Sequence, residues 1–150
     1  MIAIDTGVWI EYINTRGTLH PQAKAVVDSV NRGETTAILT PLTLTEICYV
    51  AERVYQEVHT QSQSEILARK LYDFVYYHPH VEIKPLDYEL CLNAAIIKSR
   101  YNIAFSDCFL LALSENDNVT ILFKNVESEM KQNINELNKR FNLKFLENYS

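Results

Sequence analysis

The sequence predicts an α/β fold in which a parallel sheet of four to five short strands is covered by helices on both faces. Short apolar runs of strand length alternate with longer stretches of helical periodicity along the whole chain, which is the pattern of such a sheet. The 150 residues include only three glycines and four prolines, which argues against a turn-rich all-β fold. The length fits a single domain over residues 1–150.

The first half of the chain is expected to contain three strands and four helices. Ile2–Asp5 is an apolar run too short to fold outside a sheet. Pro21 suits a first helical turn, and Pro41 is expected to end the second strand. Thr43 and Glu46 have the spacing of a capping box. The last two helices are expected to form a hairpin. The expected strands are Ile2–Asp5, Thr36–Leu39 and Val81–Ile83, and the expected helices are Val8–Ile13, Pro21–Asn31, Leu44–Val58 and Glu65–Tyr77.

The second half of the chain continues the alternation. Asp87 is expected to cap a helix that runs to about Arg100 and buries one apolar face. Ser106 is the expected N-cap of a deeply apolar helix. The remaining elements are a helix over Asp107–Ser114, a strand over Val119–Phe123, a polar helix over Glu127–Phe141 and a short final strand over Leu143–Leu146.

Composition sets limits on location and partners. No apolar run approaches the roughly 20 residues needed to span a membrane, and no signal peptide is evident, so a cytoplasmic protein without membrane contact is expected. Cys48, Cys91 and Cys108 are widely spaced among aliphatic residues. We expect all three to be reduced core residues, because no pair has zinc-binding spacing.

The net charge of −5 disfavours nonspecific coating of nucleic acid, which rewards a basic surface. It does not exclude an enzyme that contacts a short strand through a metal ion and a few cations. The basic residues available for this cluster late in the chain, at Lys98, Arg100, Lys124, Lys131, Lys139, Arg140 and Lys144.

Acidic residues stand at the ends of several expected elements. Asp5 ends the first strand, Glu46 and Asp107 lie in first turns of helices, and Glu127 or Glu129 follows the fourth strand. The carboxyl edge of a parallel sheet is where ligands bind. Carboxylates gathered there repel one another unless a cation neutralises them. Mg²⁺ or Mn²⁺ suits such an oxygen-only set and can acidify a water for attack on a phosphodiester.

Each acid also has a purely structural interpretation. The helix dipole alone favours acids such as Glu46 and Asp107 in a first turn, and Asp5 could cap the helix that begins near Val8. Asp107 heads an almost wholly apolar helix, and a charge at the mouth of a buried helix needs a partner.

These residues resemble the motifs of the PIN-domain family, most closely its VapC-like toxin ribonucleases of VapBC toxin–antitoxin pairs. The similarity covers the whole chain in the right order. The motifs are Ile4-Asp5-Thr6-Gly7-Val8-Trp9-Ile10, Thr43-Leu44-Thr45-Glu46-Ile47, Ser106-Asp107-Cys108-Phe109-Leu110-Leu111-Ala112, Lys124-Asn125-Val126-Glu127 and the closing Leu143-Lys144-Phe145-Leu146-Glu147-Asn148-Tyr149.

The resemblance implies a three-layer PIN-like fold with one metal site. Asp5, Glu46 and Asp107 would ligate Mg²⁺ or Mn²⁺, and Thr6 would support the site by hydrogen bonding.

The fourth motif departs from the family pattern. Phe123 stands where Thr or Ser is usual, two residues before Asn125. Asn125 would support the site, and the fourth acid would come from Glu127, or alternatively from Glu129. The segment that follows is also longer than is usual for the family.

The resemblance implies a function. The chain is expected to be a metal-dependent endoribonuclease that leaves a 3′-hydroxyl and a 5′-phosphate, and the toxin of a type II pair with a cognate antitoxin protein. The late basic residues would guide the RNA. Because the chain is acidic and has little basic surface, a homodimer is expected to complete the RNA groove. The alternative is a catalytically impaired PIN-like module that binds RNA or acts as a scaffold, which the altered fourth motif keeps open.

An aspartic protease is the other chemistry that the opening motif suggests, because Asp5-Thr6-Gly7 spells its triplet. That chemistry needs two carboxylates that share a proton within a β-rich fold. The helical periodicity and the scarcity of glycine argue against it.

Overall fold

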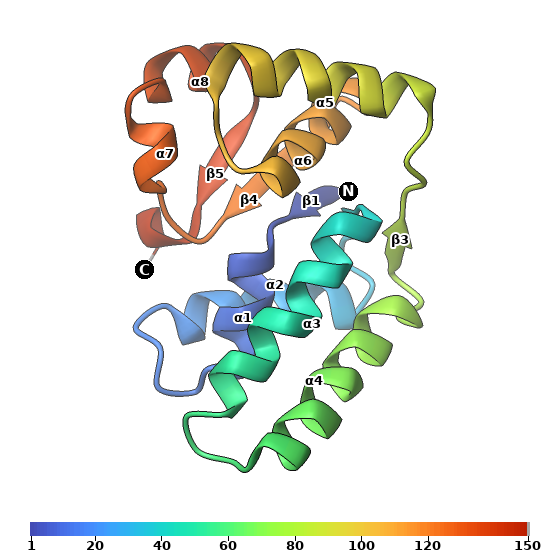
Figure 1. Ribbon diagram of the computed structural model, residues 1–150, viewed down its shortest axis with the longest axis vertical. Helices are drawn as coiled ribbons and strands as arrows, with labels where there is room; N and C mark the ends of the chain where they lie inside the picture. The colour runs from blue at the N-terminus through green and yellow to red at the C-terminus, as the bar shows by residue number, and fades with distance from the viewer. Residues whose placement is uncertain (150) are drawn as a thin grey trace.

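The computed structural model describes residues 1–149, in which five short strands form one parallel sheet between two groups of helices (Figure 1). The strand order is β3-β2-β1-β4-β5, and the predicted α/β class is confirmed. The strands are β1 (Ile2–Ile4), β2 (Ala37–Leu39), β3 (Val81–Ile83), β4 (Thr120–Phe123) and β5 (Leu143–Phe145).

The central strand β1 pairs in parallel with β2 on one side and β4 on the other. Ile2 stands opposite Ala37 of β2, and Ile4 stands opposite Leu122 of β4. Successive side chains of a strand point to opposite faces. Ala3 accordingly packs into one core and Ile4 into the other, so both faces of the sheet are buried.

Helices cover the two faces in two separate groups. The first four pack on the core that contains Ile4, and the later ones pack on the core that contains Ala3 (Figure 1). Helices α3 and α4 form the predicted hairpin. The first group is α1 (Thr6–Ile13), α2 (His20–Asn31), α3 (Pro41–Tyr55) and α4 (Gln61–Tyr76). The second is α5 (Tyr88–Tyr101), α6 (Phe105–Asn116), α7 (Ser128–Lys131) and α8 (Ile134–Arg140), with a 3₁₀ turn, η1 (Leu146–Asn148), closing the described chain.

Helix α3 begins earlier than predicted, and the expected capping box at Thr43 is wrong. Thr40 is the N-cap, and its hydroxyl accepts a hydrogen bond from the Thr43 N–H at 3.4 Å. Pro41 is the first helical residue rather than the end of the strand, because its missing N–H costs nothing there. Glu46 therefore lies in the second turn, where its side chain is available for other contacts.

Two further predictions about helices are wrong. Helix α6 begins at Phe105, after Ala104, so Ser106 is inside the helix rather than its N-cap. The predicted polar helix over 127–141 is two short helices, α7 and α8. The capping box in the described chain is instead at α4, where Thr60 and Gln63 bond reciprocally.

The cysteines differ in burial. Cys108 is buried as predicted, Cys48 is half-buried, and Cys91 is exposed on α5, which contradicts the expected core position. All three are free thiols. Trp9 is fully buried, which confirms its expected place in the core.

Within residues 1–149, no helix combines the length and the apolar character needed to cross a membrane.

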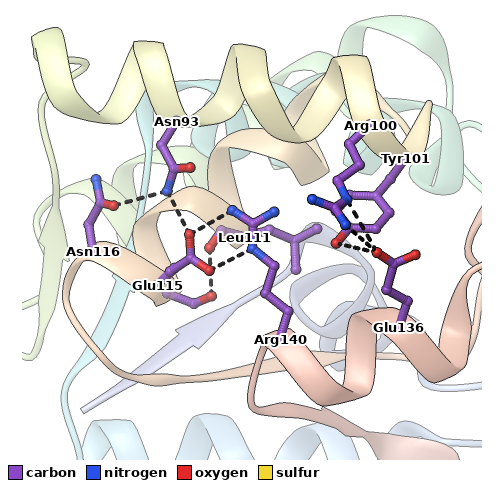
Figure 2. A network of polar contacts seen from close by, with 9 residues as sticks. Asn93, Arg100, Tyr101, Leu111, Glu115, Asn116, Glu136 and Arg140 are labelled. Carbon is purple, nitrogen blue, oxygen red and sulfur yellow. Dashed lines mark hydrogen bonds and ion pairs between the residues drawn. The ribbon is translucent and has the colours of Figure 1, made fainter.

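A polar network ties the second group of helices together (Figure 2). The Arg140 guanidinium donates to both carboxylate oxygens of Glu115, at 2.7 and 2.9 Å. It also lies 4.9 Å from the centroid of the Phe141 ring. Asn93 of α5 donates to Glu115 at 3.1 Å. A single carboxylate thus links α5, α6 and α8.

Replacing Arg140 by Lys is expected to lower the free energy of unfolding by about 1 kcal/mol, because a point charge cannot reproduce the two-pronged contact. For a chain of this size that is roughly 2–4 °C in melting temperature. The hydrogen bond from Arg140 lowers the pKa of Glu115, so the contribution is present above the ordinary carboxylate pKa. It is lost as the pH falls through the lowered value.

Thermal unfolding of both proteins between neutral and acidic pH checks this. Arg100→Lys is the matched control, because its pair with Glu136 is more exposed and should matter less. An Arg140→Lys protein as stable as the wild type at neutral pH would contradict the role of the network.

Candidate functional site

Asp5 is fixed at the carboxyl end of the central strand. Its backbone N–H donates to the Leu122 carbonyl at 3.0 Å, which continues the pairing of β1 with β4. Its side chain caps α1, with Oδ2 accepting from the Gly7 N–H at 3.1 Å. The capping role considered as the structural alternative is therefore present, and one carboxylate oxygen is used by it.

Gly7 allows the chain to pack closely at this point. A Cβ added there would lie 3.1 Å from the Lys124 Cβ and 3.2 Å from Asp5 Oδ2. The segment after β4 is thus pressed against the start of α1, which brings residues near 127 toward the end of β1.

Asp107 lies in the first turn of α6 and is 4% exposed, as is Asp5. Burial and the nearby Glu127 carboxylate raise the pKa of Asp107. Of the two acids expected after β4, Glu127 is half-buried and lies near the buried acids, whereas Glu129 is exposed.

Glu46 is half-buried and is held from the side of α6. Its Oε2 accepts a hydrogen bond from Ser106 Oγ at 2.9 Å. The Tyr49 hydroxyl lies 3.5 Å from the same oxygen. Asn125 is exposed, at the start of the loop that carries Glu127.

The electrostatics of the four acids are unfavourable without a counter-ion. Burial, with repulsion from Glu127 and Glu46, raises the pKa of Asp5 to about 7, against the opposing hydrogen bond from Gly7. Burial and repulsion from Asp5, Glu127 and Glu46 raise the pKa of Asp107 to about 10. Burial also raises the pKa of Glu127. Asp5, Asp107 and Glu127 thus have raised pKa values at the same end of the sheet, and the Glu46 carboxylate adds to the repulsion on Asp5 and Asp107.

The donor chemistry of this site fits a hard divalent cation. All of the candidate ligands are oxygens, and a divalent charge would remove the repulsion that raises these pKa values. Among residues 1–149, the buried Thr6 hydroxyl next to Asp5 has no hydrogen-bond partner, so it has a donor and lone pairs available. Within residues 1–149, however, no three His, Cys, Asp or Glu side chains already surround one point closely enough to hold an ion. The acidic side chains would need to move closer together to bind an ion. Glu46 would have to turn away from Ser106, to which it is hydrogen-bonded.

An ion pair with one buried partner lies beside this site and was not foreseen from the sequence. Glu11 of α1 is 2% exposed, and its Oε2 is 2.8 Å from Lys124 Nζ. Its Oε1 accepts from the Leu19 N–H at 2.9 Å. Glu11 thus ties the loop before α2 and the segment after β4 to α1. The available signal was a charged residue on the buried face of an apolar helix.

Several of the late basic residues are engaged within the protein. Lys124 pairs with Glu11, Arg100 with Glu136 and Arg140 with Glu115. Lys98 donates to the Ile103 carbonyl at 2.6 Å. These four groups already have partners within the protein, and the other late basic residues expected to guide RNA are Lys131, Lys139 and Lys144.

The comparisons with known proteins agree with the fold. Residues 2–127 match the family model of the PIN domain. No curated protein matches the sequence.

Solved structures share the fold at low sequence identity. VapC20 of Mycobacterium tuberculosis, described as a sarcin-ricin loop cleaving toxin, is 17% identical over 81% of this chain and 87% of its own, with a TM-score of 0.63. VapBC2 of Rickettsia felis, bound to a promoter DNA fragment, matches at 12% identity over 97% of this chain and 98% of that chain, with a TM-score of 0.64. FitAcB of Neisseria gonorrhoeae matches at 18% identity over 87% and 91%, with a TM-score of 0.61.

Replacing Asp107 by Asn is expected to stabilise the protein in the presence of a chelator. Because the pKa of Asp107 is raised, unfolding lets this carboxyl group ionise. The amide removes that free-energy gain of the unfolded state at nearly unchanged volume. We expect a gain of about 1–2 kcal/mol, since one pKa unit corresponds to about 1.4 kcal/mol, seen as a higher melting temperature. Asp73→Asn, at an exposed acid on α4, is the control and should change little. A lower melting temperature for Asp107→Asn in chelator would show that the acids do not repel one another.

Replacing Glu11 by Gln is expected to destabilise the protein by about 1–3 kcal/mol, because Lys124 would lose its charge partner at a buried contact. Urea unfolding measures the loss. Asp28→Asn is the control, since its pair with Lys24 is solvent-exposed and should be worth much less. Equal effects of the two substitutions would contradict a special role for the buried pair.

Proposed function

Because the chain belongs to the PIN-domain family, we propose that it is a Mg²⁺- or Mn²⁺-dependent endoribonuclease and the toxin of a type II toxin–antitoxin pair. The observation that carries the proposal is the pair of buried carboxylates, Asp5 and Asp107, which repel each other and Glu127 at the carboxyl end of β1. The Asp5 side chain also caps α1, but that role does not require a second buried carboxylate beside it.

The residues have distinct roles in this proposal. Asp5, Glu46 and Asp107 would hold the ion, with Glu127 as the fourth acid and Thr6 and Asn125 in support. The bound ion would supply a neutralising charge and an acidified water that attacks the RNA phosphodiester and leaves a 3′-hydroxyl and a 5′-phosphate. Ser106 would keep Glu46 in position through its hydrogen bond to Oε2. Glu127, whose pKa burial raises, would accept a proton close to the reacting water.

The proposed protein partners are a cognate antitoxin and a second copy of this chain. Support for the antitoxin comes from the relatives, since a Klebsiella pneumoniae toxin–antitoxin complex covers 87% of this chain at a TM-score of 0.60. Support for the homodimer comes from helix α5, which exposes apolar side chains. These are Tyr88, Leu92 and Ile96.

Calorimetric titration of Mn²⁺ into the native protein and into Asp5→Asn tests the metal site. We expect binding by the native protein, loss of at least ten-fold in affinity in the variant, and unchanged binding by Asp73→Asn. RNA cleavage with Mn²⁺, followed on structured and unstructured RNAs, should be lost with the same variant.

Two outcomes would contradict the proposal in different ways. Absence of Mn²⁺ binding to the folded native protein would favour the scaffold alternative and make the acids structural. Metal binding without cleavage of any RNA, and without slowed growth on expression, would remove the toxin role.

A further inference from the structure

A hollow of about 360 Å³ lies next to Glu46, between the start of α6 and the first turns of α3. We call it the Tyr49–Phe105 hollow after the two aromatic residues that line it. Its apolar walls are Leu42 and Ala104, and Glu46 also lines it. The hollow is therefore continuous with the proposed catalytic site through one carboxylate.

The packing of the fold does not require these two aromatic side chains to be exposed. Phe105 is 61% exposed although it is the first residue of a deeply buried helix, and Tyr49 is 45% exposed. The edge contact between Phe105 and Phe109, with ring centroids 5.1 Å apart, holds the Phe105 ring in place. The hydrophobic effect disfavours leaving a ring so exposed, so a ligand with a flat apolar face would stabilise this surface.

Charged groups around the hollow match a nucleotide. The Arg53 guanidinium lies over the Tyr49 ring at 5.2 Å, one turn along α3 from that residue, and is exposed. It supplies a positive charge for a phosphate at the outer rim. Glu46 stands at the inner rim, where the proposed catalytic cation would receive another phosphate. A nucleoside whose base lies between Arg53 and Glu46 would carry one phosphate at each rim, and these are two successive phosphates of one strand.

We propose that the Tyr49–Phe105 hollow binds one base of a single-stranded RNA, next to the nucleotide whose phosphate is cleaved. The inference deepens the proposed function and rests on it for the placement of that phosphate. Stacking on aromatic side chains tolerates any base, because every base has a π-face. The volume is in the range of small-ligand pockets, which fits a single base better than a protein helix.

Stacking also accounts for how a chain with net charge −5 could hold RNA. Base–aromatic contacts do not depend on neutralising phosphates, unlike a basic groove. The exposed rings would supply affinity where the paired arginines and lysines do not.

The test is the affinity of a fluorescein-labelled single-stranded RNA hexamer, measured by anisotropy in the Asp107→Asn background so that cleavage is silent. Phe105→Ala and Tyr49→Ala should each weaken binding about 5- to 100-fold. Phe105→Trp should retain affinity, and Phe105→Leu should lose it although it keeps an apolar surface. Tyr77→Ala, at another exposed aromatic residue, is the matched control and should bind as before.

Hexamers with one abasic nucleotide, moved along the strand, separate stacking from phosphate contacts. With the abasic nucleotide at one position, the hexamer should bind the Asp107→Asn protein more weakly than the intact hexamer does. Adding Phe105→Ala should then cause no further loss of affinity for that abasic hexamer. Equal affinities of all variants for the intact hexamer, or the same loss for every abasic hexamer, would overturn the proposal. If Phe105→Ala and Tyr49→Ala bind RNA normally but lose self-association in light scattering, a second subunit occupies the hollow. That result would also overturn the proposal.

Cleavage by the otherwise native protein separates this inference from the proposed function. Full cleavage activity with unchanged kcat/KM in Phe105→Ala would leave the ribonuclease standing and remove the base site. Base-dependent binding at the hollow without cleavage of any RNA by the native protein would keep the base site and remove the ribonuclease.

Discussion

The parallel pairing of the three-residue strand β1 with both neighbours is the constraint on which the site depends. Because β1 is central, the residue that follows it lies beneath helices from both halves of the chain. Asp5 is consequently desolvated, and it meets residues that are 41 and 102 positions away along the chain, Glu46 and Asp107. A short strand at the edge of the sheet would leave the same carboxylate in water, with an ordinary pKa.

The stability of the fold and the chemistry of the site work against each other at this point. Packing on both faces of the sheet pays for the burial of carboxylates that raise one another's pKa. The Asp5 cap on α1 and the pair between Glu11 and Lys124 hold the surrounding backbone in place. Carboxyl groups with strongly raised pKa values are concentrated at functional sites.

The sequence was sufficient for the features that depend on local pattern. Asp5 and Asp107 could be placed at the sheet edge because apolar runs flank them. Sequence was insufficient where two residues could each cap the same helix. Thr40 and Thr43 are both suitable N-caps of α3, and the position of Pro41 as the first helical residue makes Thr40 the cap. Sequence was also insufficient for contacts between distant residues. Ser106 resembles a cap until Glu46, 60 residues away, is seen to accept its hydrogen bond.

The internal pairing of Lys124, Arg100 and Arg140 has a consequence for how affinity would depend on salt. Each phosphate neutralised on a single strand releases bound counter-ions and contributes about 0.7 to the slope of log affinity against log salt concentration. Cations already neutralised by carboxylates release none. RNA contacts made by these three side chains would therefore add little to the salt dependence of affinity. The salt-dependent part would come from cations outside these pairs, such as Arg53, and discrimination between RNAs would rest more on shape and stacking.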